Sequence, residues 1–570
     1  GSNSYTGGTT LNGGVLQVLS DASLGDASGA LTFNGGSLNT FGDMSSTRDL
    51  LLQQNAVITT AANTTLSNSG NVSGTGGLVK NGAGGMALSG TLAHAGGTTV
   101  NDGVMTLTGS NSYTGGTTLN GGVLQVLSDA SLGDASGALT FNGGSLNTFG
   151  DMSSTRDLLL QQNAVISTAA GTTLSNSGNV SGTGGLVKNG EGAMALTGTL
   201  AHAGGTTVND GVMTLTGSNS YTGGTTLNGG VLQVLSDASL GDASGALTFN
   251  GGSLNTFGDM SSTRDLLLQQ NAVITTAANT TLSNSGNVSG TGGLVKNGAG
   301  GMALSGTLAH AGGTTVNDGV MTLTGSNSYT GGTTLNGGVL QVLSDANLGD
   351  ASGALTFNGG SLNIDGTFNS TRDLVLQQTA VINTGLDGVV SSSGDVAGNG
   401  GLVKQGGGAM TLAGTLAQAG GVTLDAGMLT LTGTNTYTGG TTLNAGVLRI
   451  QSDANLGNAA GALTFNGGTL SINGTIASER DIQLNGNGNI VTQFGDALSS
   501  SGDVSGAGAL SKDGRGVVEF TGTLSHAGGL FLNNGGMILS GSNTYTGCTK
   551  LNAGTLRVSS DANLGDAAGA

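Results

Sequence analysis

Residues 9–18 read TTLNGGVLQV, in which two short stretches with alternating apolar residues flank the corner Asn12-Gly13-Gly14. Apolar residues at every second position are typical of a β-strand with one buried face. Asn and Gly adopt positive φ more readily than other residues, so they allow a strand to turn sharply. The stretch therefore predicts two short strands joined at a corner. Similar stretches recur about every twenty residues along the chain.

A longer repeat contains these corners. Tyr5 returns as Tyr113, Tyr221, Tyr329, Tyr437 and Tyr545, at a constant spacing of 108 residues. The first three repeats are nearly identical, whereas the fourth and fifth differ more. We expect one continuous solenoid, because no linker separates the repeats. Its repeats are residues 1–108, 109–216, 217–324, 325–432 and 433–540, and a partial sixth repeat spans 541–570.

Each repeat is itself periodic. The corner residues of the first repeat and the first corner of the second are Asn12, Asn34, Asn55, Asn81, Asn101 and Asn120. They are separated by 22, 21, 26, 20 and 19 residues, which suits full turns of a parallel β-helix and exceeds the strand-to-strand spacing of a β-sandwich. The spacing predicts an all-β parallel β-helix with about five coils per repeat and about 26 coils in all. Stacked Asn side chains would form a hydrogen-bonded ladder along the corner.

The 26-residue step carries its extra length in residues 59–74. A solenoid accommodates an insertion as a loop on one face, and such loops often bind ligands. We favour the alternative, in which the segment adds a short strand to a larger corner. In later repeats the corner residue changes. Asp425 and Asp513 suit a turn, whereas Thr379 and Gln405 do so less well.

The alternation around the corners predicts which side chains point inward. Before the corners the expected inward residues are Leu11, Phe33 and Val100. After the corners they are Leu16, Val18, Leu38, Thr40, Met105 and Leu107, with Met86 and Leu88 in the fourth coil. The chain has no Pro, which fits central strands because Pro would remove a ladder N–H.

The charge balance limits the classes of partner. The chain has 14 Lys and Arg against 32 Asp and Glu, for a formal net charge of −18. Binding to nucleic acid needs clustered basic residues, so no nucleic-acid partner is expected. The apolar runs are too short to span a bilayer, so no direct membrane insertion is expected. The sequence starts in mid-pattern without a signal peptide, and we expect it to be a segment of something longer.

Residues 2–38 resemble the autotransporter-associated β-strand repeat of Gram-negative passenger regions. The matching motifs are Tyr5 to Thr10, Asn12 to Leu16, Ser20 to Gly25 and Gly29 to Gly36, and a further motif is matched by Gly77 to Gly82 and Met105 to Gly109. The resemblance covers essentially the whole chain in tandem. It implies a right-handed single-stranded parallel β-helix, exported by a barrel that this segment lacks and displayed on the bacterial outer surface as an adhesin stalk or fibre.

Residues that could support chemistry mostly recur every 108 positions. Arg48 returns in every repeat and is always followed by an acid, here Asp49. We predict a solvated Arg-Asp pair that contributes little to stability. The four histidines occupy one position in successive repeats, too far apart to share a metal ion, and we interpret them as polar turn residues. They are His94, His202, His310 and His526.

The remaining candidates also favour structural roles. Asp21 and Asp26 fit capping or Asx turns better than a calcium loop. No nucleophile elbow, phosphate-binding loop or His-Glu-x-x-His motif occurs. The sequence therefore predicts no catalytic residue, no metal site and no cofactor, and we do not expect an enzyme. Cys548 is the single Cys, so a disulfide could form only between chains.

Two functions remain open. The first is an extracellular stalk or fibre that provides reach from the bacterial surface. The second is a multivalent adhesive module, in which repeated faces bind a glycan, a cell-surface receptor or another copy of the chain, as in a biofilm. Repetition would amplify weak contacts through effective concentration.

Overall fold

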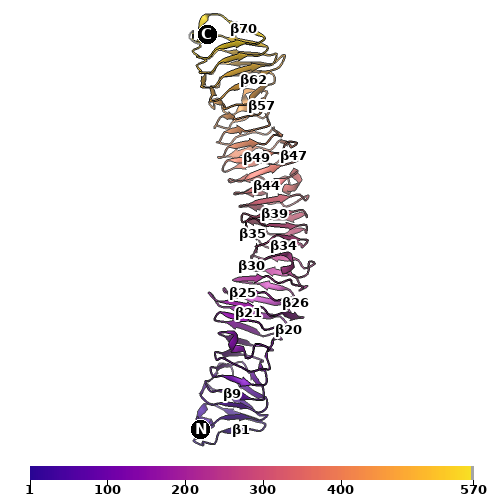
Figure 1. The fold of residues 1–570 in the computed structure, drawn as a ribbon, viewed down its shortest axis with the longest axis vertical. Coiled ribbons are helices and arrows are strands. Elements are labelled where there is room, and N and C mark those ends of the chain that lie inside the picture. The colour runs from indigo at the N-terminus through magenta and orange to yellow at the C-terminus, as the bar shows by residue number, and fades with distance from the viewer. Residues whose placement is uncertain (567–570) are drawn as a thin grey trace. The chain divides into compact units, whose positions relative to one another are not determined.

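The computed structural model describes residues 1–566 and divides into two compact units, Gly1–Gly286 and Asn287–Ala570. In both units short strands stack in parallel, turn upon turn, and short 3-10 segments are the only helices in the described residues (Figure 1). The predicted all-β parallel solenoid is confirmed. The chain forms about 28 turns, close to the predicted 26.

A turn has three faces, and each face usually carries one strand of three to five residues. The first repeat shows the pattern, which begins at Thr9 and also includes the 3-10 segment η1 (Asp21–Leu24). Its strands are β1 (Thr9–Leu11), β2 (Val15–Val18), β3 (Leu31–Phe33), β4 (Ser37–Thr40), β5 (Met44–Ser46), β6 (Leu50–Leu52), β7 (Ala56–Thr60), β8 (Thr65–Asn68), β9 (Val72–Gly74), β10 (Leu78–Asn81), β11 (Gly85–Leu88), β12 (Leu92–His94), β13 (Thr98–Val100) and β14 (Val104–Leu107).

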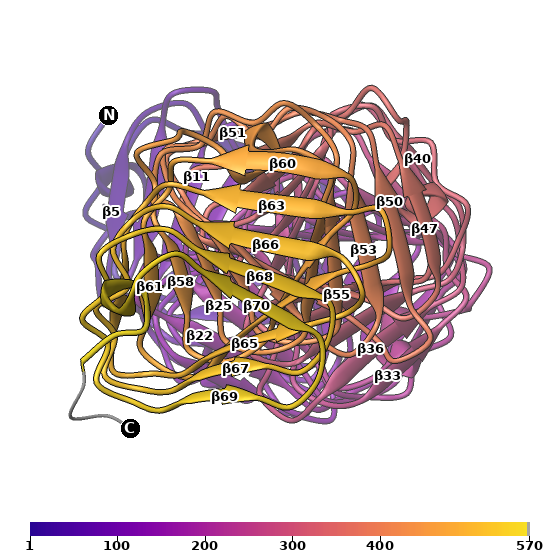
Figure 2. The same ribbon diagram turned by 90° about the horizontal axis from the view of Figure 1, so that it is seen from above.

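Within each sheet, a strand pairs in parallel with the strand one turn further on. In unit 1 the first sheet has the order β1-β3-β6-β9-β12, the second begins β2-β4-β7-β10-β13, and the third begins β5-β8-β11-β14. In unit 2, Figure 2 shows one such sheet with its strands side by side. These strands are β60 (Thr475–Ser478), β63 (Ala497–Ser500), β66 (Val517–Phe520), β68 (Gly536–Leu539) and β70 (Thr555–Val558).

The repeat does not contain a whole number of turns. In unit 1 the same stretch of sequence forms β1, β15 (Thr117–Leu119) and β29 (Thr225–Leu227), which lie in the first, second and third sheets respectively. In unit 2 the corresponding strands also lie in three different sheets; they are β43 (Thr333–Leu335), β56 (Thr441–Leu443) and β69 (Thr549–Leu551). Each repeat therefore advances about five and one-third turns. Within each unit, equivalent side chains of successive repeats consequently point in directions about 120° apart.

The extra third of a turn lies in the 26-residue step. Asn55 occupies the corner between β6 and β7, whereas Asn81 occupies the corner between β10 and β11, one turn and one face further on. Residues 59–74 hold the end of β7, a tight turn, β8 and β9. The expected additional strand is confirmed as β8, and no long loop is present in this segment.

The core is a column of inward-facing side chains in each unit. Leu11, Phe33, Leu38, Met86, Leu88, Val100, Met105 and Leu107 are buried, as predicted, and so are Val18 and Thr40. Leu16 is only half-buried because it lies in the first turn, where no earlier turn covers it. Its equivalent in the second repeat, Leu124, is fully buried. Burial of a large apolar side chain contributes about 1.5–3 kcal/mol before entropy is subtracted, so stacking between neighbouring turns supplies the stability.

Candidate functional site

The predicted corner Asn residues lie on two different corners. Asn12, Asn34 and Asn55 follow strands of the first sheet. Asn34 Nδ2 donates to Asn12 Oδ1 at 3.2 Å. Asn55 joins no Asn pair, because its Oδ1 accepts the N–H of Gly77 at 2.8 Å.

The second corner carries the longer ladder. Asn81, Asn101 and Asn120 follow strands of the second sheet, and the ladder continues to Asn142. Each Nδ2 donates to the Oδ1 one turn back, at 2.7 Å for all three steps. All four side chains remain at the surface. The ladder therefore links four turns at an exposed corner, and its Asn side chains do not cover the adjoining faces.

Arg48 is an internal anchor. It is only 2% exposed, and its Nε forms a 2.9 Å ion pair with Asp21 Oδ1 on the preceding turn. Its Nη1 donates to the carbonyls of Asp26 at 2.5 Å and Gly29 at 2.9 Å, and Nη2 donates to Gly25 at 2.6 Å. One guanidinium thus fixes the whole 3-10 loop after β2, a geometry that suits its forked donors.

The predicted solvated Arg48–Asp49 pair is therefore wrong. Asp49 Oδ1 instead accepts the N–H of Asn71 at 2.9 Å. Pairing with Asp21 could not be read from adjacency because the two residues are 27 positions apart. The same buried ion pair occurs in all five repeats, in Arg156, Arg264, Arg372 and Arg480 as well as Arg48.

Lys80 is a second buried cation, which sequence reasoning missed. It is fully buried, and its Nζ donates to the carbonyls of Asn81 at 2.8 Å, Gly82 at 2.6 Å and Asp102 at 3.2 Å. Burial lowers the pKa of Lys80 to about 8. Its inward position in the alternation of β10 was the available signal. Equivalent lysines lie at Lys188, Lys296, Lys404 and Lys512.

The prediction that the histidines are polar turn residues is wrong. His94 is buried and lies parallel to Tyr113 one turn further on, with ring centroids 5.1 Å apart. Burial lowers the pKa of His94 below its usual 6.5. The fourth repeat has a buried Gln418 at this position. These rings fill the core and lie at least one repeat apart in the sequence, so they form no common site.

The acidic residues divide into two roles. Asp21 pairs with Arg48. Asp26 Oδ1 accepts the backbone N–H of Ser28 at 3.0 Å and its hydroxyl at 2.6 Å, which is an Asx turn. The bonds from Ser28 lower the pKa of Asp26. Among residues 1–566, no group of three His, Cys, Asp or Glu side chains could hold a metal ion.

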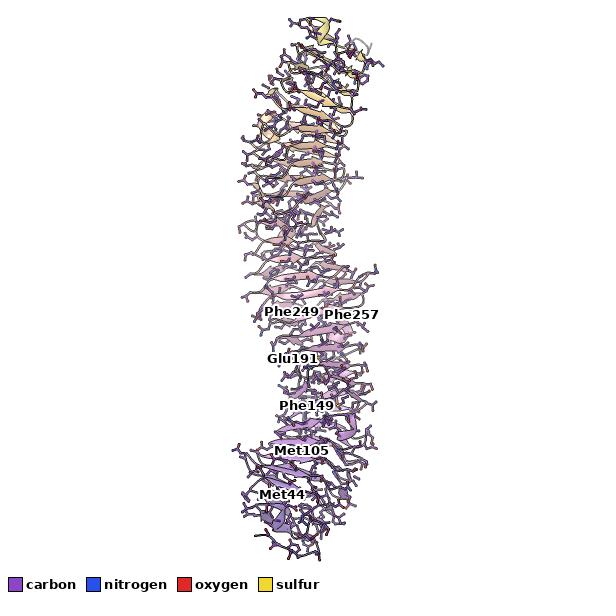
Figure 3. All side chains as sticks on the ribbon, turned by 90° about the vertical axis from the view of Figure 1, so that its left-hand side faces the viewer. Met44, Met105, Phe149, Glu191, Phe249 and Phe257 are labelled. Carbon is purple, nitrogen blue, oxygen red and sulfur yellow. The ribbon has the colours of Figure 1, made fainter. Side chains whose placement is uncertain are left out.

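An exposed apolar corner is present in each of the first three repeats. Leu19 and Phe41 lie on successive turns and are 70% and 50% exposed, and the Phe41 N–H donates to Val18 at 3.0 Å. The later copies in unit 1 are Leu127 with Phe149 and Leu235 with Phe257. Phe149 and Phe257 are labelled in Figure 3.

The fourth and fifth repeats keep an exposed apolar side chain at this corner, one turn further on. Asp365 and Asn473 replace Phe41 there. At the position of Ala62, on the next turn, these repeats carry Leu386 and Phe494, which are 87% and 88% exposed. Exposed apolar side chains that form a contiguous patch often mark interaction sites. The corner is the feature of the repeat that best fits a binding role.

Two further observations concern the surface. Cys548, the proposed intermolecular thiol, is exposed and free. No helix within residues 1–566 has the length and apolar character needed to cross a membrane.

Comparison with known families identifies the repeat. The passenger-associated-transport-repeat model matches the turns that contain the buried Lys, the Asn ladder and the aromatic stack. Its matches cover residues 1–18, 78–105, 102–126, 186–213, 210–234, 294–321, 318–342, 402–429, 424–450 and 534–558. The chain contains passenger-associated-transport repeats. The segments between the matches hold the Arg anchors and the apolar corners.

A curated relative supports this passenger-like character. The Adhesin BmaC autotransporter of Brucella suis biovar 1 (strain 1330) is 46% identical over 90 residues, which is 16% of this chain and 3% of that protein. The chain thus matches only a small part of a much longer relative. No solved structure matches the chain significantly. The passenger-associated repeats therefore form an autotransporter-passenger-like β-solenoid.

Proposed function

We propose that this segment is an extension module of a secreted or surface-displayed bacterial passenger, which extends from the outer cell surface. The observation that supports this most directly is the recurrence of one internal set of anchors in every repeat. Arg48, Lys80 and their equivalents satisfy buried polar groups without forming a unique cleft. Such repetition suits a segment whose role is to be long, and it gives no reason to propose a catalytic role.

A second candidate is multivalent adhesion to a glycan, a cell-surface receptor or another copy of the chain. The exposed apolar corner favours it, because repeats 4 and 5 lost the Phe41 side chain yet carry Leu386 and Phe494 one turn away. Since each repeat rotates by about a third of a turn, these corners point in several directions. Weak contacts in several directions would suit attachment to a matrix or a cell layer.

A deletion series in the full-length protein tests both candidates. Whole 108-residue repeats would be removed from cells that display the protein, so that every junction keeps a native sequence. An extension module predicts shorter fibres by electron microscopy and unchanged binding once fibre length is accounted for. Binding that falls in proportion to repeat number would instead favour the multivalent module. Unchanged fibre length would contradict the extension role.

A further inference from the structure

One groove in unit 2 differs from the repeated features described above. It has a volume of about 770 Å³ and crosses four successive turns, three in the fourth repeat and one at the start of the fifth. The corners that form it precede β49 (Ala380–Thr384), β52 (Leu402–Gln405), β54 (Val422–Leu424) and β56. The side chains and glycines that bear on its chemistry are Gln377, Gln378, Thr379, Asn399, Gly400, Gly401, Gly421, Thr423, Gly439 and Thr442.

The floor of this groove is bare backbone. A Cβ atom on Gly400 would lie 1.9 Å from the carbonyl oxygen of Gln378, and one on Gly439 would lie 2.2 Å from the N atom of Gly421. The turns approach so closely that only Gly fits at these positions. A ligand in the groove would therefore meet peptide groups as well as the side chains on the rim.

In the fourth repeat, a backbone N–H lacks the Asn side-chain acceptor that it has in other repeats. In repeats 1 and 2, Asn55 and Asn163 accept the N–H groups of Gly77 and Gly185 at 2.8 and 2.9 Å. In the fifth repeat, Asn487 accepts the corresponding N–H of Ala509 at 3.1 Å. The fourth repeat has Thr379 in this place, and the described residues offer no acceptor to the N–H of Gly401. That N–H lies in the groove lining.

The same repeat also frees an acceptor. In repeats 1 and 2, the hydroxyls of Thr75 and Thr183 donate to the carbonyls of Gln53 and Gln161 at 3.0 and 2.9 Å. Asn399 replaces this Thr in the fourth repeat, and Ala507 replaces it in the fifth. The bond to the Gln377 carbonyl is absent from the described residues, and the Asn399 amide is exposed beside it. Two changes on adjacent turns thus leave unused donors and acceptors in one groove.

The lining defines a ligand class. It contains amides, hydroxyls, peptide groups and the aliphatic residues Leu402, Val403 and Val422, but no charged and no aromatic side chain. Amide groups can donate to and accept from neighbouring hydroxyls at the same time. Successive turns are about 4.8 Å apart, which is close to the length of one sugar ring in a linear chain. We propose that this groove binds a neutral, linear oligosaccharide of about four sugar units, one for each turn.

This inference goes beyond the proposed extension role, because it concerns the junction of the fourth and fifth repeats and predicts one site per chain. Binding would be weak, since no aromatic side chain stacks on the sugar. It would not depend on the number of repeats as long as the fourth repeat and the first turn of the fifth are kept. The proposed extension role and the proposed oligosaccharide site can therefore be contradicted independently of each other.

The experiment uses saturation-transfer NMR with the complete chain and four probes. Cellotetraose, maltotetraose and a β-1,4-linked N-acetylglucosamine tetramer are the neutral probes, and a galacturonic acid tetramer is the acidic one. We expect at least one neutral tetramer to bind in preference to the acidic one. Absence of binding by all three neutral probes, or preference for the acidic tetramer, would overturn the proposal.

Substitutions can test the location of the site with residues that other repeats already carry at the same positions. Thr379→Asn with Asn399→Thr should restore both internal bonds and weaken binding at least tenfold. Asn55→Thr with Thr75→Asn should open the equivalent corner of the first repeat and raise the number of sites from one to two. Circular dichroism and the thermal midpoint would verify folding. Unchanged binding in the first variant, while it is folded, would overturn the assignment to this groove.

Discussion

The imidazole of His94 lies parallel to the phenol ring of Tyr113, with centroids 5.1 Å apart and planes 1° apart. The Tyr113 hydroxyl bonds to Thr117 at 2.7 Å, while His94 Nδ1 has no hydrogen-bond partner. Tyr113 is the titratable group that faces the imidazole. A neutral imidazole fits this position, because burial disfavours an additional proton more than the nearby backbone groups of Gly96 and Gly76 favour it, and the net effect lowers the pKa.

The histidines should therefore make the solenoid sensitive to acid. The pKa of each is lowered in the folded chain, so the unfolded chain binds more protons below pH 6.5. The contribution of the neutral histidines to the free energy of unfolding is therefore fully present above pH 6.5. As the pH falls below 6.5, each histidine loses up to about 1.4 kcal/mol of this contribution per pH unit. The urea midpoint at pH 7.5 and at pH 5.0 measures the effect.

Gln418 provides the matched control. Replacing His94, His202, His310 and His526 by Gln introduces the residue that the fourth repeat already carries. The difference between the two urea midpoints should shrink in this variant. An unchanged difference would show that the carboxylates, and not the imidazoles, govern the acid response.

Loss of one Arg anchor should loosen its loop. Arg372→Met would leave Asp345, which pairs with Arg372 Nε at 2.8 Å, without its cation, together with the carbonyls that the guanidinium satisfies. Removing one partner of a buried pair costs about 3–5 kcal/mol. Hydrogen exchange should rise in the segment that includes η4 (Asp345–Leu348). The exposed Arg515→Met is the control, and equal effects of both substitutions would contradict the anchoring role.

Much of the fold could be predicted from the sequence because its determinants are local. The inward positions of Phe33 and Met105 follow from alternation within a few residues, and the coil length follows from the spacing of the corners. The rotation between repeats was harder to predict. It depends on the number of faces between Asn55 and Asn81, and a step of 26 residues fits both an insertion and one and one-third turns.

The buried polar residues could not be predicted for a different reason. Arg48 meets Asp21 only after the chain completes a turn, and adjacency favoured Asp49 instead. His94 and Lys80 occupy inward positions in their strands, but polar side chains are usually expected at the surface. Their burial depends on partners from neighbouring turns, such as Tyr113 and the carbonyl of Asp102.

The Asn ladder should contribute modestly to stability. Asn120→Val removes bonds to Asn101 and Asn142, each of which would contribute about 0.5–1.5 kcal/mol if water did not replace it. Because the corner is exposed, we expect the lower end of this range. Asn12→Val removes one bond and should have a smaller effect. Differential scanning calorimetry can compare the variants, and a larger loss for Asn12→Val would argue against the ladder.

The exposed apolar corner should contribute to contacts with binding partners and not to the stability of the fold. A variant can be built from residues that other repeats carry at the same positions: Phe41→Asn, Phe149→Asn, Phe257→Asn, Leu386→Ala and Phe494→Ala. Substitutions at such exposed positions change the free energy of unfolding by about 0.5 kcal/mol or less each. The urea midpoint should therefore stay close to that of the parent chain, while retention on a hydrophobic column falls.

The same variant separates the two candidate functions. If the corner mediates multivalent attachment, cells that display the variant should lose attachment while their fibres keep full length. A matched variant with Leu19→Gln alone, which copies the Gln451 of the fifth repeat, should lose only a small part of it. Full attachment by the five-site variant would leave extension as the role of the repeats. A collapse of its urea midpoint would instead show that these side chains support the fold.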